Sequence, residues 1–256
     1  MDDPGERALR EANQMWQSLF GKEHPDTLKT AFYLASLLSG QGKYAEVETM
    51  ERELQSVRKR VLGAEHPDTL AAASIFAYAL AGQGKFAEAE KIEREVLRVR
   101  KRDLGPEHLE TLKIAADLAY SLTGQGKYAE SVKIQREELA VRTRLFGAEH
   151  RETLSTASNL AFALSYQGPN QYAEAEQMLQ ASLGSCQRVL GPSHPLTVGT
   201  ATTLENVRAN MRASFKPKQQ PRTAPPAAAG TGPAQPLPSP AGAHVLAVLA
   251  QVCWIL

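Results

Sequence analysis

The sequence lacks several features by which common protein classes are recognised. It has two cysteines in 256 residues, Cys186 and Cys253, which are too far apart to form a CxxC metal or redox motif. It contains no Asn-x-Ser/Thr acceptor for glycosylation. Its first residues, Met-Asp-Asp-Pro-Gly, are acidic and polar, whereas a secretory signal would be basic and then apolar. These absences exclude a disulfide-stapled secreted domain and predict a cytoplasmic protein.

Acidic residues are also absent after Glu205, so the chain divides into two parts by charge. Up to Ser214 it has 26 basic and 28 acidic side chains, and from Phe215 onward it has three basic side chains and no acidic one. A protein that binds nucleic acid normally presents a basic face to the phosphates. A slight acidic excess over more than 200 residues therefore predicts no nucleic-acid partner.

The sequence contains a long internal repeat, which decides its fold. Its marks are five histidines at separations of 42, 42, 42 and 44 residues, namely His24, His66, His108, His150 and His194. The last step is longer because two residues, Pro169 and Asn170, are inserted in a turn. Residues 1–20 match the second helix of a truncated unit, and residues 21–214 hold four full units of 42 to 44 residues and a terminal half unit.

Each unit is predicted to form two helices. The first begins at a Glu-His-Pro-Asp-Thr turn, where proline suits the first helical position, and ends at a Gly-Gln-Gly-Lys turn. Leucine and alanine recur along it at helical spacing and form one apolar stripe. Because a single helix pair cannot bury that stripe, neighbouring pairs must stack on one another. The prediction is an all-α protein, a right-handed α-solenoid with one concave and one convex face.

The units resemble the 42-residue tetratricopeptide repeats of kinesin light chains, in which GxEHPxT and LAxxLxxQGKYxEAE recur. The resemblance covers residues 6 to 213 and implies a scaffold that binds protein segments. Kinesin light chains carry a heptad coiled coil before the repeats, which binds the heavy chain, and here only twenty residues precede the first full unit. The resemblance therefore does not support kinesin heavy chain as a partner of this chain alone.

In that family, paired asparagines on the first helices clamp a cargo peptide. The equivalent pairs here are Phe32-Tyr33, Ser74-Ile75, Ala116-Asp117 and Ser158-Asn159, so only Asn159 keeps the type. The helical wheel places these positions opposite the apolar stripe, together with aromatic side chains one turn later. The candidate peptide groove comprises Lys29, Phe32, Tyr33, Ser74, Ile75, Tyr78, Lys113, Asp117, Tyr120, Ser158, Asn159 and Phe162.

The row formed by Tyr78, Tyr120 and Phe162 has two interpretations. It is either an open aromatic surface that binds a partner, since exposed apolar patches usually mark such sites, or the edge of the core packed on the following helix. Replacing Tyr78 and Tyr120 with alanine distinguishes the two.

Other signals have structural explanations. The five histidines are too far apart to share a metal ion and are assigned to the turn or helix cap. The glutamate pairs at 46/48 and 88/90 indicate a solvated helix face. The basic runs at 58–60 and 100–102 complement the helix dipole. Cys186 replaces an arginine of the earlier units and is expected at or just beneath the helix surface.

The end of the chain differs from the repeats. Residues 215–242 are rich in proline and alanine and are predicted to be a disordered linker. Residues 243–256 form an apolar tail of fourteen residues, shorter than the roughly 20 that a membrane span requires. We therefore do not expect membrane insertion, and a short helix that docks on the solenoid or on a partner is favoured.

The sequence predicts a non-catalytic scaffold that binds a peptide or helix of a partner protein in the concave groove. No catalytic, cofactor or metal site is predicted. The alternative is that the chain is a fragment of a larger motor-adaptor or signalling protein, in which the repeats serve as an oligomerisation or sensor module. In either case, self-association through the uncapped amino-terminal end is a second expected interaction.

Overall fold

The computed structural model describes residues 3–214, so the predicted linker and apolar tail lie outside the described residues. Within this range the chain forms ten α-helices, one 3-10 helix and no strand, which confirms the predicted all-α fold. The elements are α1 (Pro4–Phe20), α2 (Pro25–Gly40), α3 (Tyr44–Val61), α4 (Pro67–Gly82), α5 (Phe86–Asp103), α6 (Leu109–Gly124), α7 (Tyr128–Phe146), α8 (Arg151–Ser165), η1 (Pro169–Gln171), α9 (Tyr172–Val189) and α10 (Pro195–Ser214).

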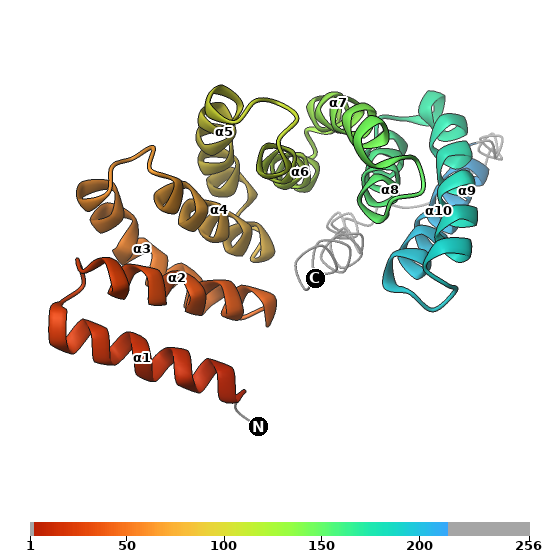
Figure 1. Ribbon diagram of the computed structural model, residues 1–256. Helices are drawn as coiled ribbons and strands as arrows, with labels where there is room; N and C mark the ends of the chain where they lie inside the picture. The colour runs from red at the N-terminus through yellow and green to blue at the C-terminus, as the bar shows by residue number, and fades with distance from the viewer. Residues whose placement is uncertain (1–2, 215–256) are drawn as a thin grey trace, which may run out of the picture.

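The helices stack in chain order along an open arc (Figure 1). Helices α2, α4, α6 and α8 line the inside of the arc, and α3, α5, α7 and α9 form its outside. The core consists of successive clusters between neighbouring helices. In one of them, Leu38 and Val47 of the first unit pack with Ile75 of the next unit. Clusters of this kind cross from one unit to the next, as expected for a solenoid.

A histidine caps the start of each inner helix and of α10. Its Nδ1 accepts a hydrogen bond from the backbone N–H two residues later, at distances of 3.1 to 3.3 Å for His24, His66, His108, His150 and His194. This contact satisfies one of the amide groups that have no partner within the helix. The predicted turn or cap role of the histidines is confirmed.

The two glycines of the Gly-Gln-Gly-Lys turn serve different purposes. The second, such as Gly84, has a positive φ of 80°, which glycine adopts without steric cost. The first, such as Gly82, is helical and lies against the Tyr44 ring of the preceding unit, where an added Cβ would come within 2.5 Å of a ring carbon. The same close approach joins Gly124 to Phe86. These glycines therefore let an aromatic ring from one unit pack onto the backbone of the next.

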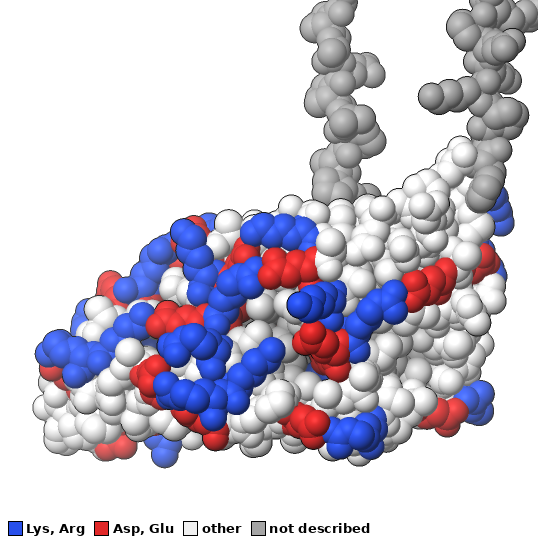
Figure 2. Space-filling view, turned by 90° about the horizontal axis from the view of Figure 1, so that it is seen from above, with Lys and Arg blue, Asp and Glu red and all other residues white. Residues whose placement is uncertain are grey.

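Ion pairs recur in three series, which we call the ion-pair ladders. The first two series connect neighbouring units, and the third joins two residues of the same unit. Their members are, in turn, Arg10–Glu46, Arg52–Glu88, Arg94–Glu130 and Arg136–Glu174; Lys43–Glu6, Lys85–Glu48 and Lys127–Glu90; and Arg60–Glu23, Arg102–Glu65, Arg144–Glu107 and Arg188–Glu149. Seen from above, acidic and basic side chains lie beside one another over much of the surface (Figure 2). The prediction of a freely solvated glutamate face is wrong for Glu48 and Glu90, because each is 9% exposed and paired with a lysine of the next unit.

Candidate functional site

Three pockets follow one another along the inside of the arc. The first, of about 240 Å³, lies mainly on α2 and is lined by Lys29, Phe32 and Tyr33. The second, of about 210 Å³, lies between α2, α4 and α6 and includes Ser74, Ile75, Lys113 and Asp117. The third, of about 50 Å³, lies between α6, α7 and α8 and includes Tyr120 and Asn159. Nine of the twelve residues of the sequence-predicted groove thus line consecutive pockets on one face.

The remaining three predicted residues are buried. Tyr78 is 6% exposed, Ser158 is 1% exposed and Phe162 is 8% exposed. Ser158 bonds to Thr200 of α10 at 3.0 Å and to the Leu154 carbonyl at 3.0 Å. These side chains hold helices together, and Ile75 is only 2% exposed although it lines the second pocket, so an accessible role in the groove is left to the other eight.

The aromatic row is part of the packing and is not an open surface. Tyr78 meets the Tyr44 ring edge-on at 5.8 Å between ring centroids, and Tyr120 meets Phe86 at the same distance and the same angle of 78°. Burial raises the pKa of Tyr120 to about 12. The expected open row is wrong because Tyr44 and Phe86 reach over the glycine of the next unit and cover Tyr78 and Tyr120. Phe162 packs instead on Tyr166 at the end of its own helix, at 4.9 Å between ring centroids. The two tyrosines of the row thus pack on the preceding helix pair, whereas the second interpretation of the aromatic row predicted packing on the following helix.

Buried arginines form the floor of the three pockets. Arg58, Arg100 and Arg142 occupy equivalent positions 42 residues apart on α3, α5 and α7, and each lines one pocket. Their exposures are 1%, 9% and 7%. Arg58 and Arg100 lie in the last turns of their helices, as the dipole interpretation requires, but each is also held in a specific ion pair that this interpretation did not include. The sequence signal that could have revealed these buried arginines is a basic residue that recurs at one repeat position among apolar neighbours that face the core.

Each arginine is neutralised in a different way. Arg58 pairs with Glu51 of its own helix at 2.5 Å and donates to the Leu28 carbonyl at 3.3 Å. Arg100 pairs instead with Glu110 of the next unit. Charged groups so well buried require such partners, since an isolated buried ion is strongly unfavourable.

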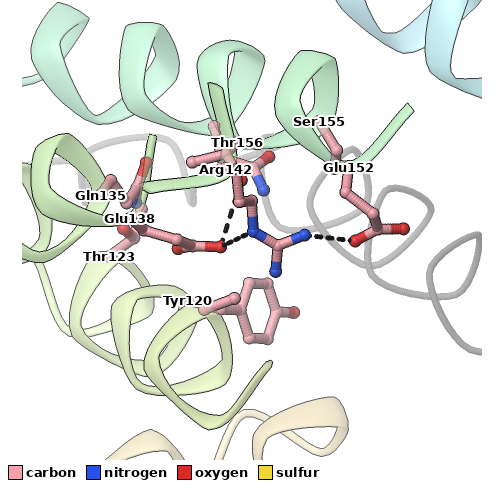
Figure 3. A pocket seen from close by; sticks show the side chains of 10 residues that line it. Tyr120, Thr123, Gln135, Glu138, Arg142, Glu152, Ser155 and Thr156 are labelled. Carbon is pink, nitrogen blue, oxygen red and sulfur yellow. Dashed lines mark hydrogen bonds and ion pairs between the residues drawn. The ribbon is translucent and has the colours of Figure 1, made fainter. Parts of the chain in front are cut away.

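In the third pocket, the guanidinium of Arg142 lies between two carboxylates (Figure 3). It contacts Glu138 at 2.7 Å and Glu152 at 2.7 Å. Thr156 donates to Glu138 at 3.1 Å, and the Tyr120 ring lies beneath the guanidinium. Burial raises the pKa of Glu138 to about 7, against the opposing effect of Arg142.

Because Arg100 pairs with Glu110, a buried carboxyl group has no basic partner. Glu93 is fully buried, its Oε1 accepts from Ser121 at 3.0 Å, and its Oε2 has no hydrogen-bond partner. Burial, with a smaller contribution from the Asp117 carboxylate, raises the pKa of Glu93 to about 8. Burial likewise raises the pKa of Asp117 to about 6.

The buried charges end before the fourth unit. Cys186 replaces the arginine there, is fully buried, and packs with Leu154 and Leu196. The expectation of a thiol at or just beneath the surface is therefore wrong. Its pKa is raised by burial. In the part of the chain that the structure describes, no three His, Cys, Asp or Glu side chains are placed to share a metal ion.

The structure defines a helical-repeat protein with a pocketed concave face. A tetratricopeptide repeat model matches residues 27–68, 69–110 and 153–196, and a second tetratricopeptide repeat model matches residues 110–169. Together the matches span residues 27–196, well over half of the chain. The chain belongs to the tetratricopeptide repeat family.

Solved structures share this fold. The chain is similar to nearly identical TPR-like repeats of a putative kinesin light chain of Podosopora anserina, with a TM-score of 0.62, 22% identity and coverage of 75% of this chain and 90% of that one. A Q17M variant of those repeats gives a TM-score of 0.63 at 22% identity, covering 72% and 86%. BtubC (BKLC) of P. vanneervenii gives 0.56 at 17% identity, covering 88% and 95%. No curated protein matches the sequence. None of the helices among residues 3–214 is both long enough and apolar enough to cross a bilayer.

Proposed function

We propose that this protein is a non-catalytic scaffold that binds an extended segment of a partner protein along the inside of the arc. The supporting observation is the succession of three pockets on one face, one for each step of the solenoid. Partner binding is the general role of tetratricopeptide repeats, and the structural likeness to kinesin light chain repeats supports an adaptor role. Binding to a kinesin heavy chain is not part of the proposal.

The first two pockets offer the accessible contacts. Tyr33 is 49% exposed, beside Phe32 and Lys29. An exposed aromatic beside polar groups is the arrangement that contributes most at protein interfaces. Asp117 and Lys113 add charged contacts in the second pocket.

Selection of peptides from a random library on the purified chain tests this proposal. Tyr33→Ala and Lys113→Glu should each weaken binding of the selected peptides by about tenfold or more, the effect of losing a central interface contact. Gln180→Ala, an exposed change on outer helix α9, is the matched control and should leave affinity unchanged. Selected peptides whose affinity is insensitive to both groove variants would show that the groove is not the site.

A second role, as an oligomerisation module, is favoured by one feature outside the groove. Helix α1 exposes large apolar side chains, with Met15 51%, Leu19 65% and Phe20 54% accessible. Such a patch commonly marks an interface with another protein.

A further inference from the structure

Helix α1 carries an apolar stripe that resembles one half of a two-helix interface. Gly5, Ala8, Ala12, Met15 and Leu19 follow one another at intervals of three, four, three and four residues. This alternation is the heptad spacing that keeps one face of a helix toward a partner helix. Gly5 and Ala8 are exposed, Ala12 is half-buried, and Met15 and Leu19 are more than half exposed. We call these five residues the α1 seam.

The first four positions of the equivalent seam are covered elsewhere in the molecule, whereas the last one, Val61 at 39%, stays exposed. Forty-two residues later on α3, the corresponding positions are Val47, Met50, Leu54, Val57 and Val61. Val47 packs with Leu34 and Ala35 of α2, and Leu54 packs with Leu28 and Ala31. On α1 the other side of the helix faces α2, through Leu9. Among residues 3–214 no helix covers the α1 seam.

At the other end of the part of the chain that the structure describes, α10 presents no comparable surface. The outer side of α10 exposes Thr202, Glu205 and Arg212, together with a single large apolar residue, Val198 at 52%. A polar terminal face of this kind is compatible with water, as expected of a capping helix. The apolar seam is therefore specific to α1, and it cannot be matched by a head-to-tail contact with α10.

We propose that a second copy of this chain covers the α1 seam, with the two α1 helices packed antiparallel about a two-fold axis between Ala12 and Met15. This pairing develops the second role proposed above and is independent of peptide binding in the groove. A two-fold interface requires a patch that is complementary to itself. The α1 seam meets that requirement through the sizes of its side chains.

Size decides the orientation of the pair. The small residues Gly5, Ala8 and Ala12 occupy the first half of the seam, and the large residues Met15 and Leu19 occupy the second half. In an antiparallel pair, Ala8 of one helix lies opposite Leu19 of the other, and Ala12 lies opposite Met15. The four layers formed by Ala8, Ala12, Met15 and Leu19 then each combine one small and one large side chain, so the helix axes stay evenly spaced, and Gly5 lies beyond the last of these layers. A parallel pair would leave small residues facing each other at one end and large residues crowded at the other.

Charge does not oppose this arrangement. The seam has no ionisable residue, and Glu11 beside it already pairs with Arg7 of its own helix at 3.7 Å. In the antiparallel register, the flanking Glu11 lies beside Ser18 of the other copy, so no like charges are brought together. Because the interface is one helix wide, we expect a weak dimer, with a Kd on the order of micromolar.

Sedimentation velocity of the full chain, over roughly 1 to 500 µM, tests the proposal around that expected Kd. The wild type should change from monomer to dimer, and Met15→Glu and Leu19→Glu should each raise the dimer Kd at least tenfold. The matched control is Val189→Glu on α9, which occupies the same position in its unit as Leu19 and is 48% exposed. All three side chains are exposed, so the substitutions should not disturb the core. Helix content measured by circular dichroism checks that each variant folds.

Three results of the sedimentation experiment are incompatible with the proposal. A wild type that stays monomeric throughout, a dimer insensitive to both α1 variants, or equal loss in the Val189→Glu control would each overturn the proposal. Unchanged peptide binding by the Met15→Glu variant would show that the groove and the seam act separately, so failure of one does not imply failure of the other.

Disulfide trapping tests the orientation, in a Cys253→Ser background and with the fully buried Cys186 left in place. A mixture of Ala12→Cys and Met15→Cys chains should cross-link as a heterodimer faster than either chain links to itself. Faster self-linkage of both single variants would indicate a parallel pair and refute the antiparallel register.

Discussion

Replacing Glu93 with glutamine removes the buried carboxyl group that has no basic partner while keeping its shape and its contact with Ser121. Burial raises the pKa of this carboxyl to about 8 in the folded chain, from its ordinary value of 4.5. Folding at intermediate pH therefore requires the uptake of a proton. The stability associated with the protonated Glu93 carboxyl is fully present below pH 4.5 and is lost as pH rises through about 8.

At pH 7 the unfolded carboxyl is ionised and the folded one is protonated. The gap between pH 7 and 4.5 corresponds to at most about 3 kcal/mol of lost stability at 1.36 kcal/mol per pKa unit. Glu93→Gln should recover up to that amount at pH 7 and close to nothing at pH 4.5. For a chain of this size, the gain corresponds to a melting temperature higher by roughly 6 to 12 °C.

Thermal unfolding followed by circular dichroism between pH 4.5 and 8 provides the measurement. Glu51→Gln is the matched control, because Glu51 holds the same position one unit earlier but is paired with Arg58. That change leaves a buried guanidinium without its partner and should destabilise by about 3 to 5 kcal/mol. The reasoning fails if Glu93→Gln is no more stable than the wild type at pH 7, or if its advantage does not shrink toward pH 4.5.

Three further predictions concern contacts between units. Gly124→Ala should destabilise by about 1 to 3 kcal/mol, since its Cβ would overlap the Phe86 ring, whereas Gly40→Ala, which has no atom within 4 Å of the added Cβ, should be neutral or stabilising in thermal melts. His108→Ala should lower stability by about 0.5 to 2 kcal/mol through loss of the cap on α6, and an unchanged urea midpoint would contradict the cap assignment. The hydrogen bond from Lys85 lowers the pKa of Glu48 to about 2, so its contribution is present above pH 4.5 and is lost as pH falls toward 2; Lys85→Met should raise that pKa toward its ordinary value in a carboxyl NMR titration, and no change would refute the pairing.

The fold could be predicted because each repeat contains residues that mark where its helices begin and end. A fixed period, a histidine turn and a glycine turn define where each helix begins and ends, and the structure confirms the helices and the caps. Phe32, Tyr33 and Asp117, which the helical wheel assigned to the candidate groove, line pockets in the structure. These properties depend on one helix at a time, which is the range over which a helical wheel is informative.

The errors arose where two units meet. A wheel drawn for α4 cannot show that Tyr44 reaches across from α3 to cover Tyr78. Nor can it show whether Arg100 turns to Glu93 in its own helix or to Glu110 in the next, because the two choices differ by side-chain conformation and not by sequence pattern. The pairing of the buried charges beneath the groove is therefore decided by packing between units, which the sequence pattern does not encode.

The ion-pair ladders give the solenoid a mechanical property. Pairs such as Arg52–Glu88 and Arg94–Glu130 join exposed groups, so each contributes between about 0 and 1 kcal/mol to stability. Many of these pairs bridge neighbouring units along the arc, which makes them act together as elastic restraints on its curvature. Salt weakens such pairs, because the screening length falls from about 8 Å at physiological ionic strength to about 3 Å at 1 M. A higher salt concentration should therefore make the arc easier to bend and so change the width of the groove available to a partner.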